Sequence, residues 1–211
     1  IIGILGPNGC GKTTTIGMIL GLLKPSKGEV LINGIEIETK RVDLLDNLNF
    51  ISPYIELPKK LTVKQNLEVY GRLYDVQNLK NKINTLSEKL RLNEIIDKIT
   101  GELSSGQKNR VSLAKSIIND PLVLLLDEPT ASLDPETGDF VRSFLENYQK
   151  EMKASILLAS HNMSEVERLC SSVLMMKNGS IIDQGSPNKL IEKHGRKNME
   201  EVFLKLTREK I

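Results

Sequence analysis

Residues 1–15 read IIGILGPNGCGKTTT, and this stretch decides the fold. Its apolar beginning ends at Gly6 and a helix can start near Gly11, so the stretch predicts a strand, a glycine loop and a helix in that order. Residues 6–13 match the pattern GxxxxGK followed by Ser or Thr at every defined position. In this strand–helix context the pattern is typical of a loop whose backbone N–H groups surround a polyphosphate.

Each residue type in the loop has a chemical reason. Gly6, Gly9 and Gly11 let the backbone turn its N–H groups inward and approach phosphate oxygens without Cβ clashes. The helix that follows adds unpaired amides and a positive dipole end. Lys12 can reach the β- and γ-phosphates of a nucleoside triphosphate, and the Thr13 hydroxyl can hold Mg²⁺.

Composition narrows the class of protein. The 211 residues can bury a full core and fit one domain, with room for an inserted lobe. Charged residues make up 27% of the chain and the net charge is +2, so bulk charge gives no reason to expect nucleic-acid binding. The apolar run over residues 16–23 is too short to span a bilayer. Cys10 and Cys170 give no framework for disulfides or zinc, and we expect a protein of a reducing compartment.

The distribution of strand and helix patterns predicts the architecture. Continuous apolar runs at residues 122–126 and 155–159 are typical of strands buried on both faces of a parallel sheet. Asn33 and Gly34 lie between alternating apolar residues, which predicts a small antiparallel hairpin. We therefore expect an α/β fold, a P-loop NTPase core with a mostly parallel sheet. Residues from about 60 to 118 show helical patterns without a clear strand, which predicts a helical lobe inserted in the core.

Three polar residues follow the predicted buried strands. Asp127 and Glu128 stand at the carboxyl end of one strand, where open α/β sheets bind ligands, and His161 ends another. Asp127 can bind Mg²⁺ beside Thr13, and Glu128 can orient or deprotonate a water that attacks a γ-phosphate. The His161 imidazole can donate a hydrogen bond to the same phosphate. His194 has no comparable context, and we assign it no role.

A second helix start has the features of an anion site. Ser104 is a good N-cap, and Ser104, Ser105 and Gly106 open a helix that continues over residues 108–118. The chain has one phosphate loop but two helix starts suited to phosphate. This indicates that the second start binds the nucleotide of another molecule.

The chain carries, in order, the motifs GPNGCGKTT, LSSGQ, VLLLDEPTASLD and SH, and with them it resembles the nucleotide-binding domain of ABC ATPases over essentially all 211 residues. The resemblance implies a single domain of residues 1–211 and two subunits, identical or different, packed head to tail around two ATP molecules. The loop over residues 132–134 would cross the interface between them. The residues implied in nucleotide binding are Gly6, Pro7, Asn8, Gly9, Cys10, Gly11, Lys12, Thr13 and Thr14 of one subunit, with Ser104, Ser105, Gly106, Gln107 and Asp134 of the other.

The same resemblance implies the catalytic and metal-binding roles. Asp127 would be the Walker B aspartate that binds Mg²⁺ together with Thr13. Glu128 would be the catalytic carboxylate and His161 the switch histidine, acting with Lys12. The implied substrate is ATP and the implied cofactor is Mg²⁺.

Three segments resemble the exporter-type branch of the family, namely LTVKQNLEVYGRLYDV, SHNMSEVERLC and NMEEVFLKLTREK. In that branch the ATPase drives a separate integral membrane permease. The resemblance therefore implies a subunit that hydrolyses ATP to power export. It would lie at the cytoplasmic face of the cell membrane, bound peripherally through the permease.

Three features depart from the family pattern. Ser105 replaces the second glycine of the usual LSGGQ, and we expect this to be tolerated because serine still presents its amide. Pro53 or Tyr54 occupies the place of the glutamine that senses Mg²⁺ and contacts the permease, and Gln65 lies too far along the chain to replace it. The family's N-terminal strands, which carry an aromatic residue that stacks on adenine, are missing. We therefore expect an N-terminally incomplete chain.

Two other functions are compatible with the motifs. A soluble, non-transport ABC protein acting on ribosomes or DNA usually has tandem cassettes or long coiled-coil insertions, and this sequence shows neither. Its near-neutral charge also offers no obvious surface for a phosphate backbone. A nucleotide-dependent regulator with weak hydrolysis is favoured only by the missing glutamine. We favour the transporter ATPase over both.

Overall fold

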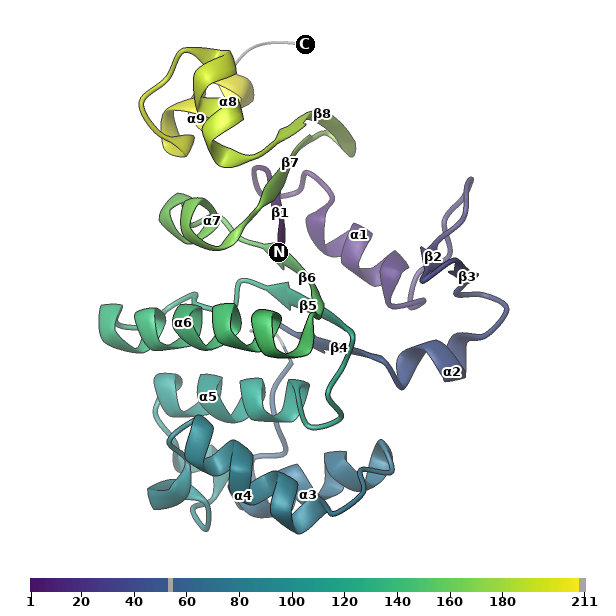
Figure 1. Cartoon of the computed structure of the whole chain (residues 1–211), viewed down its shortest axis with the longest axis vertical. Helices are drawn as coiled ribbons and strands as arrows, with labels where there is room; N and C mark the ends of the chain where they lie inside the picture. The colour runs from purple at the N-terminus through teal and green to yellow at the C-terminus, as the bar shows by residue number, and fades with distance from the viewer. Residues whose placement is uncertain (53–54, 209–211) are drawn as a thin grey trace. The chain divides into compact units, whose positions relative to one another are not determined.

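The computed structural model describes residues 1–52 and 55–208, and Figure 1 labels its helices and strands. The chain forms two compact units, each built from stretches that are separate in the sequence. The first unit consists of Ile1–Leu45, Leu125–Glu128 and Ser155–Ile211, and the second of Asp46–Leu124 and Pro129–Ala154.

A mostly parallel sheet forms the core of the first unit. Its central strand, β1 (Ile2–Leu5), pairs in parallel with β6 (Ser155–Ala159) on one side and with β7 (Ser172–Lys177) on the other. β8 (Ser180–Gly185) adds an antiparallel edge beside β7. With the end of β5 (Val123–Asp127) beside β6, the strand order in this unit is β5-β6-β1-β7-β8.

Residues 3–5 of the strand β1 are buried, whereas Ile2 at its start is exposed. Ile4 lies opposite Ala159 in β6 and opposite Leu174 in β7, and Leu5 is fully buried. The predicted α/β fold with a mostly parallel sheet is confirmed. Because the phosphate loop follows Leu5 directly, it begins at the carboxyl edge of this sheet.

A two-stranded antiparallel hairpin also belongs to the first unit, as predicted. β2 (Leu31–Ile32) and β3 (Ile35–Glu36) are joined by Asn33 and Gly34. Both turn residues have positive φ angles, 51° and 77°, which is the conformation of a type I′ turn.

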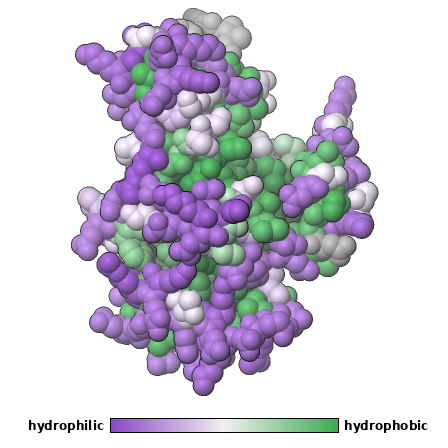
Figure 2. Space-filling model, viewed as in Figure 1, coloured by the Kyte–Doolittle hydropathy of each residue, from purple (hydrophilic) through white to green (hydrophobic). Residues whose placement is uncertain are grey.

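The C-terminal helices pack on one another through an apolar stripe. α9 lies against α7 and α8, and it buries Met199 and Val202 completely. In Figure 2 the side of α8 and α9 in view is mainly hydrophilic, as expected of amphipathic helices. The helices of the first unit are α1 (Lys12–Ile19), α2 (Arg41–Leu45), α7 (Met163–Leu169), α8 (Pro187–His194) and α9 (Met199–Arg208).

The second unit is largely helical. Among its described residues between 60 and 118, the only strand-like pairing is the isolated bridge between Thr62 and Ile99. Val123 at the start of β5 donates a backbone hydrogen bond to Asn47, just before β4. The elements of the unit are β4 (Leu48–Ile51), α3 (Val63–Leu73), α4 (Leu79–Lys89), the short turns η1 (Asn93–Ile95) and η2 (Thr100–Glu102), α5 (Ser105–Ser116) and α6 (Pro135–Met152).

Local sequence signals account for where these helices begin. Thr62 forms a capping box with Gln65 at the start of α3, and Ser104 forms one with Gln107 at the start of α5. At the start of α6 the Asp134 carboxylate accepts a hydrogen bond from a backbone N–H, and a proline follows at the first helical position. In the part of the chain that the structure describes, no helix is both long and apolar enough to cross a bilayer.

Candidate nucleotide site

The glycines of the loop over residues 6–11 are needed for two different reasons. Gly9 and Gly11 have φ angles of 78° and 111°, which side-chain-bearing residues adopt only with strain. Gly6 has no such angle, but a Cβ there would collide with the carbonyl oxygen of Met176 and the sulfur of Cys10. The loop conformation therefore depends both on backbone freedom and on close packing.

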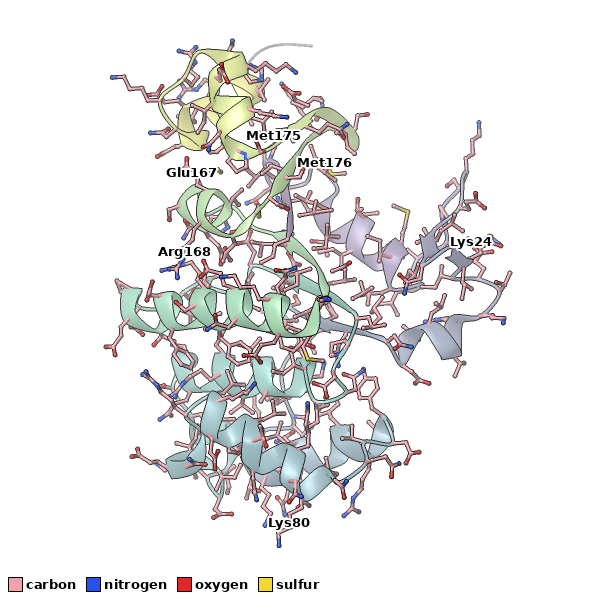
Figure 3. All side chains as sticks on the ribbon, in the orientation of Figure 1. Lys24, Lys80, Glu167, Arg168, Met175 and Met176 are labelled. Carbon is pink, nitrogen blue, oxygen red and sulfur yellow. The ribbon has the colours of Figure 1, made fainter. Side chains whose placement is uncertain are left out.

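The turn between β7 and β8 supports this loop from one side. The Gly179 N–H donates to the carbonyl oxygen of Cys10 at 2.9 Å. Met176, labelled on β7 in Figure 3, lies next to a register shift in the β7–β8 pairing and belongs to the same apolar cluster as Cys10. The Cys10 side chain is thus part of the packing beneath the loop, and its backbone faces the turn.

Lys12 lies across the loop that precedes it. Its side chain is buried, and Nζ donates hydrogen bonds to the carbonyl oxygens of Gly6 at 2.7 Å and of Pro7 at 3.3 Å. The N-cap of α1 is Gly11, and no side chain caps this helix. An ammonium group and an uncapped helix start therefore converge at the end of β1, and this donor set fits a polyphosphate.

The first turn of α1 also contacts the end of β5. The Thr13 hydroxyl lies 3.5 Å from Oδ2 of Asp127, which is buried. Burial, and then the neighbouring Glu128 carboxylate, raise the pKa of Asp127, while Lys12 and the Thr13 hydroxyl oppose the rise. A cation beside these oxygens would stabilise the ionised carboxylate.

A hydroxyl and a carboxylate are oxygen ligands of the kind that Mg²⁺ prefers. Among the described residues, no three His, Cys, Asp or Glu side chains are grouped as a metal cage. That is compatible with Mg²⁺, which usually takes one or two protein oxygens and completes its shell with waters and substrate phosphates. The Thr13–Asp127 pair therefore fits this ion.

Glu128 and His161 form a direct contact. Oε2 of Glu128 lies 2.7 Å from Nδ1 of His161, and the His161 backbone N–H points at the same oxygen over 3.4 Å. Glu128 has a positive φ of 52°, and its N–H donates to the carbonyl oxygen of Ala159 at 2.8 Å. This strained conformation holds the carboxylate at the shared edge of β5 and β6. The imidazole is mostly exposed, with 68% of its side chain accessible.

In the second unit, the beginning of α5 is organised by Ser104. Its hydroxyl accepts a hydrogen bond from the Gln107 N–H at 3.3 Å, and the Gln107 side chain accepts one from the Ser104 N–H at 3.0 Å. Ser104 and Ser105 are exposed. The serine-rich helix start is thus rigid and accessible at once.

The beginning of α6 lies next to that of α5. A Cβ on Gly106 would lie 3.3 Å from the Thr137 hydroxyl oxygen, in the first turn of α6. The Thr137 N–H donates to the Asp134 carboxylate at 2.9 Å, and this bond lowers the pKa of Asp134. The predicted nucleotide residues of the second unit therefore form one cluster around two neighbouring helix starts.

The profile of a known family, the ABC transporter family, matches residues 1–131 of this sequence. The chain belongs to the ABC transporter family. The ABC transporter ATP-binding protein NatA of Bacillus subtilis (strain 168) is 34% identical over 207 residues, covering 97% of this chain and 84% of NatA. The Nod factor export ATP-binding protein I of Rhizobium sp. (strain N33) is 36% identical over 203 residues, covering 95% of this chain. The chain spans 66% of that relative's length.

A solved structure of an ATP-binding subunit of an ABC transporter superimposes with a TM-score of 0.89 at 25% identity. The match covers 98% of this chain and 88% of that one. The chain is thus an ATP-binding subunit of the ABC type and an ATPase, as the motifs predicted.

The two compact units divide the predicted ATP-site residues of this ABC protein between them. The phosphate loop, Asp127, Glu128 and His161 belong to the first unit, whereas residues 104–107 and Asp134 belong to the second. Within each unit the predicted residues come together. The predicted replacement of the family glutamine, at Pro53 or Tyr54, lies outside the described residues.

Two features of the candidate nucleotide site were not predicted from the sequence. The sequence patterns placed Glu128 and His161 at strand ends but did not predict their contact, although adjacent parallel strands bring their carboxyl ends to one edge. They also did not predict that Met176 and Gly179 support the loop. The turn itself was recognisable from Asn178-Gly179, but no local pattern specifies which loop a distant hairpin touches.

Proposed function

We propose that this ABC ATPase powers a separate integral membrane permease in the direction of export. It would act at the cytoplasmic face of the membrane, bound there through the permease. The exporter-like segments and the similarity to a Nod factor export ATP-binding protein support this direction. The main support for the proposed ATP hydrolysis is the 2.7 Å contact between Glu128 and His161. It lies at the edge of the sheet where the phosphate loop begins.

Glu128 is the group best suited to act on water. Its carboxylate is only 17% exposed, and the backbone bond to Ala159 fixes its direction. It would accept a hydrogen bond from the attacking water, orient it towards the γ-phosphorus and take up its proton. Lys12 would hold the β- and γ-phosphates and neutralise their charge.

His161 would contact the γ-phosphate through its other nitrogen. Because Nδ1 faces a carboxylate oxygen, Nδ1 carries a proton, and Nε2 is left for the substrate. Nε2 is the ring nitrogen that would approach a phosphate oxygen.

Thr13 and Asp127 would hold Mg²⁺. When bound, Mg²⁺ supplies positive charge against the triphosphate oxygens. The remaining loop residues from Gly6 to Thr14 would surround the phosphates with backbone N–H groups.

The second cluster is proposed to complete the site of another subunit. Residues 104–107 and Asp134 would contact the ATP that is held by the phosphate loop of a partner ABC subunit, identical or different. The accessible start of α5 supports this role, because Ser104 and Ser105 are exposed and a helix N-terminus attracts an anion.

The test is Glu128→Gln in the full chain. We expect steady-state ATP turnover to fall about 10²–10³-fold, the usual value of a key polar catalytic group, while ATP binding is kept. Glu200→Gln, at an exposed position on α9, is the matched control and should leave turnover unchanged. Turnover by Glu128→Gln above about a hundredth of the wild-type rate would mean that another group activates the water.

Partner identity is tested separately. Co-purification with a polytopic membrane protein supports the transporter, whereas co-purification with ribosomes or DNA would point to the non-transport alternative.

A further inference from the structure

Three polar residues around His161 form a closed ring of hydrogen bonds. The Ser160 hydroxyl donates to Oε2 of Glu165 at 2.6 Å, and the Asn162 N–H donates to the Ser160 oxygen at 3.0 Å. The Glu165 N–H donates in turn to Oδ1 of Asn162 at 3.3 Å. These hydrogen bonds span the turn from β6 to α7, which consists of residues 160–162. His161 is the middle residue of this turn.

The capping of α7 does not explain why the carboxylate of Glu165 is buried. Glu165 and Ser160 are both fully buried, and burying a carboxylate is costly unless it is well bonded. Asn162 already caps α7 through its side chain, so the helix start does not require the Glu165 carboxylate. Oε2 of this carboxylate accepts a hydrogen bond from the hydroxyl of Ser160, the residue that precedes His161.

The position of the His161 imidazole depends on the backbone of residues 160–162. Its side chain is 68% exposed, so packing does little to hold it. Both its backbone N–H and its Nδ1 approach the same oxygen of Glu128, at 3.4 Å and 2.7 Å. Two contacts from one residue to one oxygen require a particular backbone geometry, and the ring of hydrogen bonds fixes the residues on either side.

We propose that Glu165 is a positioning residue for ATP hydrolysis. Through Ser160 and Asn162 it fixes the turn after β6 and so holds the His161 imidazole against Glu128. The proposal rests on the catalytic roles proposed above for Glu128 and His161.

A neighbouring glutamate on the same helix provides the control. Glu167 accepts a hydrogen bond from the Met199 N–H at 2.6 Å, and Figure 3 shows it on the side of α7 towards the C-terminal helices. Glu167 thus joins α7 to α9, and no hydrogen bond of the ring involves it. Glu167→Gln alters the attachment of α7 and leaves the ring intact.

The first readout is ATP turnover by the full chain. Because a misplacement of about 1 Å can cost about 10²-fold, we expect Glu165→Ala to lower kcat by about tenfold or more, with the KM for ATP changed less than about twofold. Glu165→Gln retains an acceptor oxygen for Ser160 and should restore most of the activity. Glu167→Gln should leave kcat unchanged. An equal loss in Glu165→Ala and Glu167→Gln would overturn the proposal, because it would indicate a general effect on α7.

The second readout is the imidazole of His161, followed by the NMR resonance of its Cε1–H. The chain has two histidines, so His161→Ala assigns the signal. Glu165→Ala should move the resonance towards its position in Glu128→Gln, and Glu165→Gln should return it. An unmoved resonance in Glu165→Ala would overturn the proposal, whatever the turnover. If Glu165→Ala does not fold, Ser160→Ala removes the same hydrogen bond and is held to the same two criteria.

His161→Ala separates this inference from the proposed function. If His161→Ala keeps wild-type turnover, the role assigned to the histidine is wrong. If it lowers turnover while Glu165→Ala changes neither the turnover nor the imidazole resonance, the histidine role stands and the positioning role of Glu165 is wrong.

Discussion

At the scale of single residues, the phosphate loop contains two kinds of glycine. Gly6 is the buried first residue of the loop, and a Cβ there would meet the backbone of Met176. Gly9 is exposed, and a Cβ added there would have no neighbour within 4 Å, so only its φ of 78° restricts the residue type. The sequence pattern predicts both glycines but does not tell these two causes apart.

We expect Gly6→Ala to destabilise the protein more than Gly9→Ala. Left-handed backbone costs a side-chain-bearing residue about 1–2 kcal/mol, which sets the loss for Gly9→Ala. Gly6→Ala adds a collision with backbone that cannot be relieved by a side-chain rotation, so its loss should be larger. Unfolding by denaturant measures the free energy of unfolding of each variant. Gly28→Ala, with a φ of 83° and an equally open surrounding, is the control for backbone strain outside the loop.

A loss of stability in Gly9→Ala equal to or larger than that in Gly6→Ala would contradict the packing of Met176 against the loop. Gly28→Ala should match Gly9→Ala in stability and leave ATP binding unchanged.

At the scale of helices, two capping boxes in the second unit are alike in geometry and differ in proposed function. Thr62 with Gln65 begins α3, and Ser104 with Gln107 begins α5. Both could be recognised in the sequence from the residue types and the spacing of three. Only the second lies in the segment that the ABC motifs assign to nucleotide binding.

Thr62→Ala and Ser104→Ala should therefore cost similar stability and differ in activity. Loss of an N-cap costs about 0.5–2 kcal/mol, and we expect both variants to fall in this range. ATP turnover should fall in Ser104→Ala, because the first turn of α5 loses its fixed amides, and should stay near wild type in Thr62→Ala. Thermal unfolding and steady-state turnover are measured on the same samples. Equal turnover in the two variants would contradict the role of the α5 start.

The features that could not be predicted from the sequence are contacts between segments that lie far apart in the chain. The strands, the helix starts and the Asn33-Gly34 turn follow from local residue patterns, and the structure contains them. The hydrogen bond from Gly179 to the phosphate loop depends on which strands become neighbours in the sheet. The same is true of the ring of hydrogen bonds among Ser160, Asn162 and Glu165. No local pattern states that order, so these contacts required the structure.

At the scale of the whole molecule, each compact unit carries one set of the residues predicted to bind the nucleotide. The first holds the phosphate loop with Glu128 and His161, and the second holds the two neighbouring helix starts. A head-to-tail pair would give each ATP one set from each subunit. Such a pair of identical chains has twofold symmetry, so the arrangement closes at two copies and does not extend into a filament.

The most direct test is the mass of Glu128→Gln in solution, measured by light scattering with and without Mg²⁺ and ATP. Blocked hydrolysis keeps the nucleotide in place, so we expect the mass of one copy without ATP and of two copies with it. Ser104→Ala in the same background should weaken the pair. If Glu128→Gln binds ATP and stays strictly monomeric at high concentration, the shared-nucleotide account is wrong.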